Sequence, residues 1–136
     1  MRSRVRHAQA RTTYETGTTI EWPEEIGGRD DIALCLSQTW NPDPEVRKQA
    51  VRTLCPCHLK ANHEQVWDRL IAMVADEDPK VRSHILHVLA DGSPRSREQE
   101  IVQALETMQR DPDVKLRRRV RKLLAQYRRT GKINVL

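Results

Sequence analysis

The chain has 136 residues, of which 38% are apolar and 32% charged, and its formal net charge is +5 at pH 7. This length is typical of one domain, and the lack of Phe disfavours a thick globular core. No apolar run is long enough for a membrane span or a secretory signal, which predicts a cytoplasmic protein without membrane contact. Three cysteines, an odd number, predict reduced thiols.

The N-terminal segment, residues 1–29, is predicted to lie outside the regular part of the chain. Its first 12 residues carry four arginines and no acid, and we expect them to be mobile. Residues 13–29 are expected to fold back over the first unit and cover its apolar face. We predict that this contact lies at Trp22 and Trp40. Trp40 is expected to be partly exposed.

One phrase of the sequence occurs three times. NPDPEVRKQAVRTL begins at Asn41, DEDPKVRSHILHVL at Asp76 and DPDVKLRRRVRKLL at Asp111, an interval of 35 residues. Within each copy the apolar positions recur at i, i+4 and i+8, which is one face of a helix. The aligned apolar columns are Val46, Val81 and Leu116; Ala50, Ile85 and Val120; and Leu54, Leu89 and Leu124.

Helix boundaries are also marked in each copy. Asp43 and Asp78 precede a proline, which predicts an N-cap followed by Pro at the first helical position. Pro56 and the sequence DGSP from Asp91 mark two helix ends. Three further amphipathic segments keep the same register and predict a second helix in each unit, near residues 30–40, 64–75 and 97–110.

The unit is therefore predicted to be helix, turn, helix. A single pair of helices cannot bury its apolar stripe alone, but neighbouring pairs bury one another. We predict an all-α fold, an α-solenoid of about three helical hairpins with an N-terminal extension. The expected units are residues 30–58, 64–92 and 97–128, followed by a tail at 129–136.

The pattern D-x-D-P-x-V-R followed by A-x-x-x-L resembles the second helix of HEAT repeats, in particular the short bacterial type similar to phycobilisome-lyase HEAT-like repeats. The resemblance covers roughly residues 30–128. It implies a scaffold or a peptide-binding surface. It implies no lyase activity, because a fold does not by itself define a function.

Aspartate and arginine recur together once in each copy, and two interpretations are open. The arginines could form a row of cations that binds a ligand. The resemblance to HEAT proteins favours a structural ladder, in which each Arg pairs with the turn Asp of its own or a neighbouring unit. The residues concerned are Asp43, Arg47, Asp78, Arg82, Asp113 and Arg117.

A dense basic cluster ends the third copy. Its members are Lys115, Arg118, Arg119, Arg121, Lys122, Arg128 and Arg129. Like charges at i and i+4 repel, so the cluster is predicted to face outward. There it could bind nucleic-acid phosphates, an acidic protein or the chain's own acidic middle, or it could simply confer solubility. Tyr127 is the one aromatic residue nearby, so any nucleic-acid contact would be to phosphates.

A second cluster raises the question of a metal. It comprises Cys55, Cys57, His58 and His63. One residue between paired cysteines is a poor spacing for structural zinc, and Cys55 aligns with Ala90 and Ala125 at a core position. No metal and no cofactor are therefore predicted. His84 and His87 are interpreted as surface or groove residues rather than ligands.

No pattern of residues predicts a catalytic site, because no glycine loop suits phosphate and no base is positioned beside a nucleophile. We therefore predict a non-enzymatic adaptor with a protein partner. The alternative is phosphate-backbone binding of nucleic acid by the basic C-terminal helix and the Arg-rich N-terminus. The sequence does not determine the oligomeric state.

Overall fold

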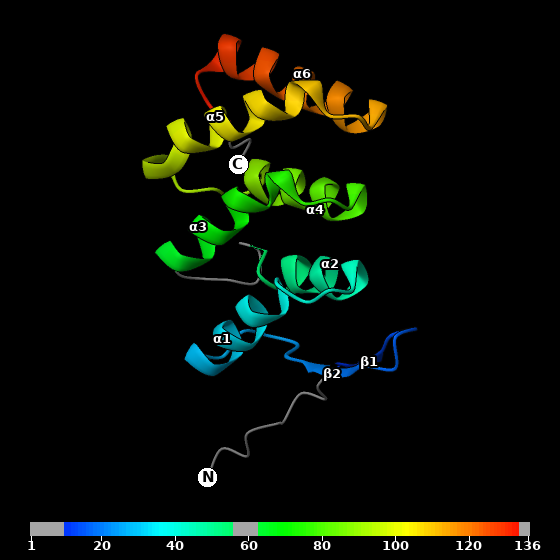
Figure 1. The fold of residues 1–136 in the computed structure, drawn as a ribbon. Helices are drawn as coiled ribbons and strands as arrows, with labels where there is room; N and C mark the ends of the chain where they lie inside the picture. The colour runs from blue at the N-terminus through cyan, green and yellow to red at the C-terminus, as the bar shows by residue number, and fades with distance from the viewer. Residues whose placement is uncertain (1–9, 56–62, 134–136) are drawn as a thin grey trace.

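The computed structural model describes residues 10–55 and 63–133 (Figure 1). A short β-hairpin precedes six α-helices in these residues, and three short 3-10 turns follow or precede helices. The hairpin strands are β1 (Ala10–Thr13) and β2 (Thr19–Trp22). The helices are α1 (Arg29–Gln38), α2 (Pro44–Thr53), α3 (Glu64–Ala72), α4 (Pro79–Ala90), α5 (Glu98–Thr107) and α6 (Val114–Thr130). The 3-10 turns are η1 (Met73–Ala75), η2 (Arg95–Arg97) and η3 (Met108–Arg110).

The helices form three consecutive pairs, as the register predicts. In Figure 1, α2, α4 and α6 lie along one side of the molecule, and α1, α3 and α5 lie along the other. Helix α4 packs against both α2 and α6, and α3 packs against α5. The molecule therefore has two layers. One contains the first helix of each pair (α1, α3 and α5), and the other contains the second helix of each pair (α2, α4 and α6).

The predicted N-caps start the second helices. The side chain of Asp43 accepts a hydrogen bond from the backbone N–H of Glu45 at 2.9 Å, and Asp78 accepts one from Lys80 at 2.8 Å. Asp113 caps α6 in the same way. Each aspartate satisfies N–H groups that have no partner inside the helix, which fixes where the helix begins.

The aligned apolar columns form one continuous core. Residues of all three columns are at most 3% exposed, and Trp67 of α3 is buried beside them. The fully buried stripe of each second helix thus packs between neighbouring pairs. No helix in the described part of the chain combines the length and the apolar character needed to cross a bilayer.

The N-terminal segment differs from the expected mobile tail. Ala10–Thr13 pairs antiparallel with Thr19–Trp22, so residues 10–12 belong to a strand, and residues 1–9 lie outside the described residues. Ile20 and Trp22 are buried in the common core, and the Trp22 indole donates to the Tyr14 hydroxyl at 2.9 Å. The hairpin lies beside the first helix pair (Figure 1).

Trp40 does not accompany Trp22 at this contact. Its side chain is 71% exposed, as expected, but the Arg69 guanidinium of α3 lies over its ring, 3.5 Å from the centroid. Arg69 also donates to the Thr39 hydroxyl and carbonyl oxygens. Trp40 therefore marks the contact between the first and second pairs, not the contact with the N-terminal hairpin.

The C-terminal tail begins later than predicted. Helix α6 continues to Thr130 and ends at Gly131, whose φ of 72° lies in the left-handed region that favours glycine. The chain then turns, and Ile133 is buried in the common core with 1% exposure. Ile133 therefore belongs to the core, whereas Gly131 and Lys132 remain exposed.

Candidate binding face on the second helices

Arg47 and Arg82 each contact an aspartate of the following unit, but this aspartate differs from the predicted one. Arg47 donates from Nε and Nη2 to both carboxylate oxygens of Asp76, each at 3.0 Å. Arg82 makes the same two-pronged contact with Asp111, at 2.8 and 3.0 Å. The predicted partners Asp43, Asp78 and Asp113 are occupied as N-caps. Each of these two arginines instead binds an aspartate in the turn of the following unit, two residues before the aspartate that caps the next second helix.

These arginines are fully engaged within the stack. Besides Asp111, Arg82 donates from Nη1 to the backbone carbonyls of Asp76 and Glu77 in its own turn. The hydrogen bond to Asp76 is the main cause that raises the pKa of the Arg47 guanidinium above its usual value. Both arginine side chains are about nine-tenths buried, so neither presents an exposed cation to a ligand.

Twelve exposed or half-buried positions, four from each second helix, form a different, basic surface, which we call the second-helix face. In this face, seven of twelve positions are Lys or Arg, two are His, and the single acid, Glu45, pairs with Lys48 at 2.7 Å. None of the twelve residues is buried. They are Glu45, Lys48, Gln49 and Arg52 of α2; Lys80, Ser83, His84 and His87 of α4; and Lys115, Arg118, Arg119 and Lys122 of α6.

Charge is sorted between the two layers. Helices α1, α3 and α5 have formal charges of −1, −1 and −3, whereas α2, α4 and α6 have +2, +2 and +8. The acidic middle inferred from the sequence is therefore not uniformly acidic. Of its helical carboxylates, all but Glu45 lie on the first helices, whereas the second helices α2 and α4 together carry five cations.

Two hollows interrupt the second-helix face. One, with a volume of about 410 Å³, is lined by Arg52 of α2, His84 and His87 of α4, and Arg119 of α6, among others. The Arg119 guanidinium crosses between helices and donates to the Ser83 hydroxyl at 2.9 Å. The second hollow, about 420 Å³, adds Lys122 of α6. These shared linings make the face continuous across three helices.

The positive charge of the face affects the pKa of His84. Burial is the main cause that lowers the pKa of His84, and the positive charges of Lys48, Arg52 and Arg119 lower it further, as does His87. These groups come from α2, α4 and α6. The imidazole therefore lies in a field produced jointly by all three second helices.

The predicted basic cluster is exposed on α6 throughout. Arg119 and Lys122 line the hollows beside α4, while Arg121, Arg128 and Arg129 lie outside the second-helix face as defined above. In the N-terminus, Arg11 pairs with Glu21 at 2.6 Å, and the other arginines of that segment lie outside the described residues. The structure thus groups part of the cluster with α2 and α4, which the sequence reasoning did not.

A usable signal for this grouping was present in the sequence. The 35-residue step aligns Arg52, His87 and Lys122 in one column and Gln49, His84 and Arg119 in a second. The apolar columns of the same register were recognised because burial patterns are regular. These two polar columns lie on the opposite side of the same helices.

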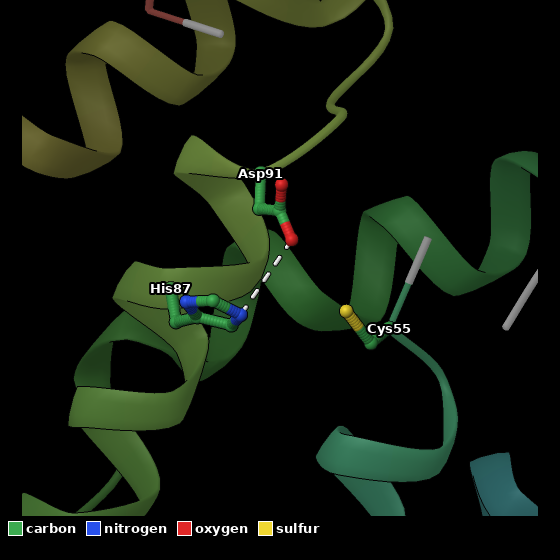
Figure 2. A group of neighbouring side chains, drawn as sticks. All are labelled: Cys55, His87 and Asp91. Atoms are coloured by element: carbon green, nitrogen blue, oxygen red, sulfur yellow. Dashed lines mark ion pairs between the residues drawn. The ribbon is translucent and has the colours of Figure 1, made fainter. Parts of the chain in front are cut away.

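The candidate metal residues are only partly brought together. Cys57 and His58 lie outside the described residues, and His63 is the residue before α3. Cys55, at the end of α2, is buried as the alignment predicts. Its sulfur, however, lies within 4.8 Å of ligand atoms of His87 and Asp91, a grouping that the sequence did not suggest (Figure 2).

The third thiol is a core residue. Cys35 of α1 is fully buried, and burial raises its pKa to about 12. Its thiol therefore stays protonated at neutral pH, and it serves as a small apolar side chain.

The paired helices, the capped turns and the arginine contacts between units define a helical repeat protein. A family model described as HEAT repeats matches residues 32–125, which is more than half of the chain. The chain belongs to the HEAT-repeat family. Searches of curated proteins and of solved structures each found no match.

Proposed function

We propose that this chain is a non-enzymatic interaction module, an α-solenoid adaptor that binds an acidic segment of a partner protein on the second-helix face. HEAT repeats commonly mediate protein–protein interaction, which supports the general class. The observation that carries the specific proposal is the sign of the face: seven Lys or Arg against one Glu, across three helices. Such a surface attracts acidic ligands and repels basic ones.

The shape of the face supports a peptide or loop as the ligand. The two hollows run between neighbouring second helices, and their linings combine cations with apolar atoms of residues such as Leu86 and Val88. An extended acidic segment can place carboxylates on the cations and apolar side chains in the hollows. The acidic first helices make the opposite layer unsuitable for the same ligand.

The test is binding of an aspartate-rich peptide, measured by fluorescence anisotropy. Reversing Arg52, Arg119 and Lys122 to Glu should weaken binding by about tenfold or more, since each exposed charge pair contributes about 0.2–1 kcal/mol. The matched control reverses Arg121, Arg128 and Arg129 to Glu, which changes the net charge equally but leaves the face intact. It should retain most of the affinity. Equal losses in both variants would contradict a defined face.

Phosphate-backbone binding of nucleic acid is the second candidate, favoured by the eight cations and no acid of α6. Duplex DNA would contact the whole of α6, so both charge-reversal variants would lose affinity. The logarithm of the binding constant would also fall steeply with the logarithm of salt concentration. DNA binding with this pattern, together with no peptide binding, would replace the first proposal with the second.

A further inference from the structure

Three side chains with different ligand atoms meet where α2 ends beside the end of α4. Cys55 follows α2 by two residues, His87 lies in the last turn of α4, and Asp91 directly follows that helix. One sulfur, one nitrogen and one oxygen atom from these residues all lie within 4.8 Å of one another. Figure 2 shows the three side chains converging from the two helix ends.

The distances are close to those of a metal site. A Zn²⁺ ion binds Cys, His and carboxylate at about 2.0–2.3 Å, which places neighbouring ligand atoms of a tetrahedron about 3.3–3.8 Å apart. His87 Nε2 and Asp91 Oδ2 are already 3.6 Å apart. The Cys55 sulfur lies within 4.8 Å of both atoms, so a shift on the order of 1 Å at that side chain would bring it to the tetrahedral spacing.

The orientation of His87 favours chelation over proton relay. In a Cys-His-Asp relay the thiol and the carboxylate contact opposite nitrogens of the imidazole. Here Nε2 is the nitrogen that faces Asp91, and in Figure 2 the Cys55 sulfur lies on that same side of the ring. One nitrogen directed at the space between a sulfur and a carboxylate oxygen is the arrangement of a metal ligand.

We propose that Cys55, His87 and Asp91 bind a divalent metal ion of the zinc class. The mixed sulfur, nitrogen and oxygen set suits a borderline ion rather than Mg²⁺ or Ca²⁺, which prefer oxygen. Cys55 lies at the buried side, and the His87 side chain is 60% exposed, so the remaining coordination position faces the hollow. The thiolate and the carboxylate balance the charge of the ion, which offsets the repulsion from Arg52 and Arg119.

The site uses two residues that the sequence interpretation separated. Cys55 was grouped with Cys57, His58 and His63, whereas His87 was placed on the surface. The contact between α2 and α4 brings Cys55 to His87, 32 positions away along the chain. The ion would therefore join the ends of α2 and α4. Its binding should stabilise the folded chain.

The test uses the full chain freed of metal and titrated with Co²⁺, followed by displacement with Zn²⁺. Cobalt should produce a thiolate charge-transfer band and the visible bands of a tetrahedral site, and Cys55→Ser should abolish the charge-transfer band. His87→Gln and Asp91→Asn, which change exposed or half-buried side chains, should each weaken Zn²⁺ affinity by about tenfold or more. They should also abolish the rise in melting temperature on adding Zn²⁺.

Two controls separate this site from other ligand sets. His84→Gln changes a neighbouring histidine of the same hollow and should leave metal affinity unchanged. The double variant Cys57→Ser/His58→Gln should also retain the charge-transfer band. A band that survives Cys55→Ser and disappears in the double variant would overturn the assignment, as would no cobalt binding by the wild-type chain.

Discussion

Single residues link the three helix pairs through a few charged contacts. The Asp76 carboxylate accepts two hydrogen bonds from the Arg47 guanidinium, and its Oδ1 also accepts one from the backbone N–H of Asp78. Asp111 accepts the corresponding hydrogen bonds from Arg82 and from the backbone N–H of Asp113. The first unit has Asn41 at this position. Its side-chain oxygen accepts the backbone N–H of Asp43 at 2.9 Å, so a neutral acceptor is sufficient for the local turn.

The contribution of these contacts to the free energy of unfolding can be measured by substituting Arg82. Arg82→Ala would leave Asp111, whose side chain is 4% exposed, as an uncompensated buried charge, which costs about 3–5 kcal/mol. The free energy of unfolding from urea denaturation should fall by that amount. Because the change also removes the hydrogen bonds from Arg82 to the carbonyls of Asp76 and Glu77, we expect a lower melting temperature as well.

Arg117 is the natural control for Arg82. It occupies the same column, but within the described residues its side chain donates to the Asp111 carbonyl at 3.1 Å and to no aspartate carboxylate. Arg117→Ala should therefore cost only about 1 kcal/mol. Similar losses for the two variants would show that the contact between units is not the important part of the arginine's role.

At the scale of elements, each second helix starts and ends for local reasons. Asp43, Asp78 and Asp113 cap the starts, and the left-handed Gly131 ends α6. The end of α6 matters beyond the helix, because the turn at Gly131 returns the chain so that Ile133 is buried. A helix that failed to stop there would leave this apolar side chain outside the core.

We expect Gly131→Ala to destabilise the protein by about 1 kcal/mol, because a Cβ is unfavourable at φ 72°. A Cβ built at this position meets no atom within 4 Å, so the cost comes from the backbone and not from a clash. Gly131→Asn should cost less, since Asn tolerates the left-handed region better. The free energy of unfolding measures both, and equal values for Ala and Asn would contradict this explanation.

At the scale of the whole molecule, stacking separates opposite charges into two layers. The first helices together carry −5 and the second helices +12. The small overall charge of +5 therefore conceals a strongly polar molecule. This separation is what makes the second-helix face a candidate for acidic ligands.

His84 reports on this field, and its titration gives a prediction with a definite sign. Burial and the surrounding cations lower its pKa, so an acidic ligand that neutralises the cations should raise it back towards about 6.5. Proton uptake on binding means that an aspartate-rich peptide should bind more tightly at pH 5.5 than at pH 7.5, with the peptide still ionised. NMR titration of His84 with and without peptide measures the shift.

The His84→Gln variant provides the control, because it should reduce this pH dependence while leaving affinity at pH 7.5 nearly unchanged. A His84 pKa that stays the same in the saturated complex would place the peptide away from the second-helix face.

The N-terminal hairpin shows where sequence reasoning was incomplete. Thr12, Thr13, Thr19 and Ile20 are β-branched and flank Gly17, whose φ of 85° forms the turn. This pattern could have predicted a hairpin. It was interpreted only as an extension, because the helical register does not cover it and an isolated two-stranded hairpin is unstable without a surface to pack against.

The sequence by itself determined the number of helices, their caps and their buried stripes, because these depend on residues one to eight positions apart. The tertiary structure decided which aspartate each arginine binds, since Arg47 and Asp76 are 29 positions apart and meet only through the offset between stacked turns. It also decided that Cys55 lies beside His87 and that cations from three helices share one face. Such contacts between units depend on how far each pair is shifted and rotated on the next, which no periodicity within one helix specifies.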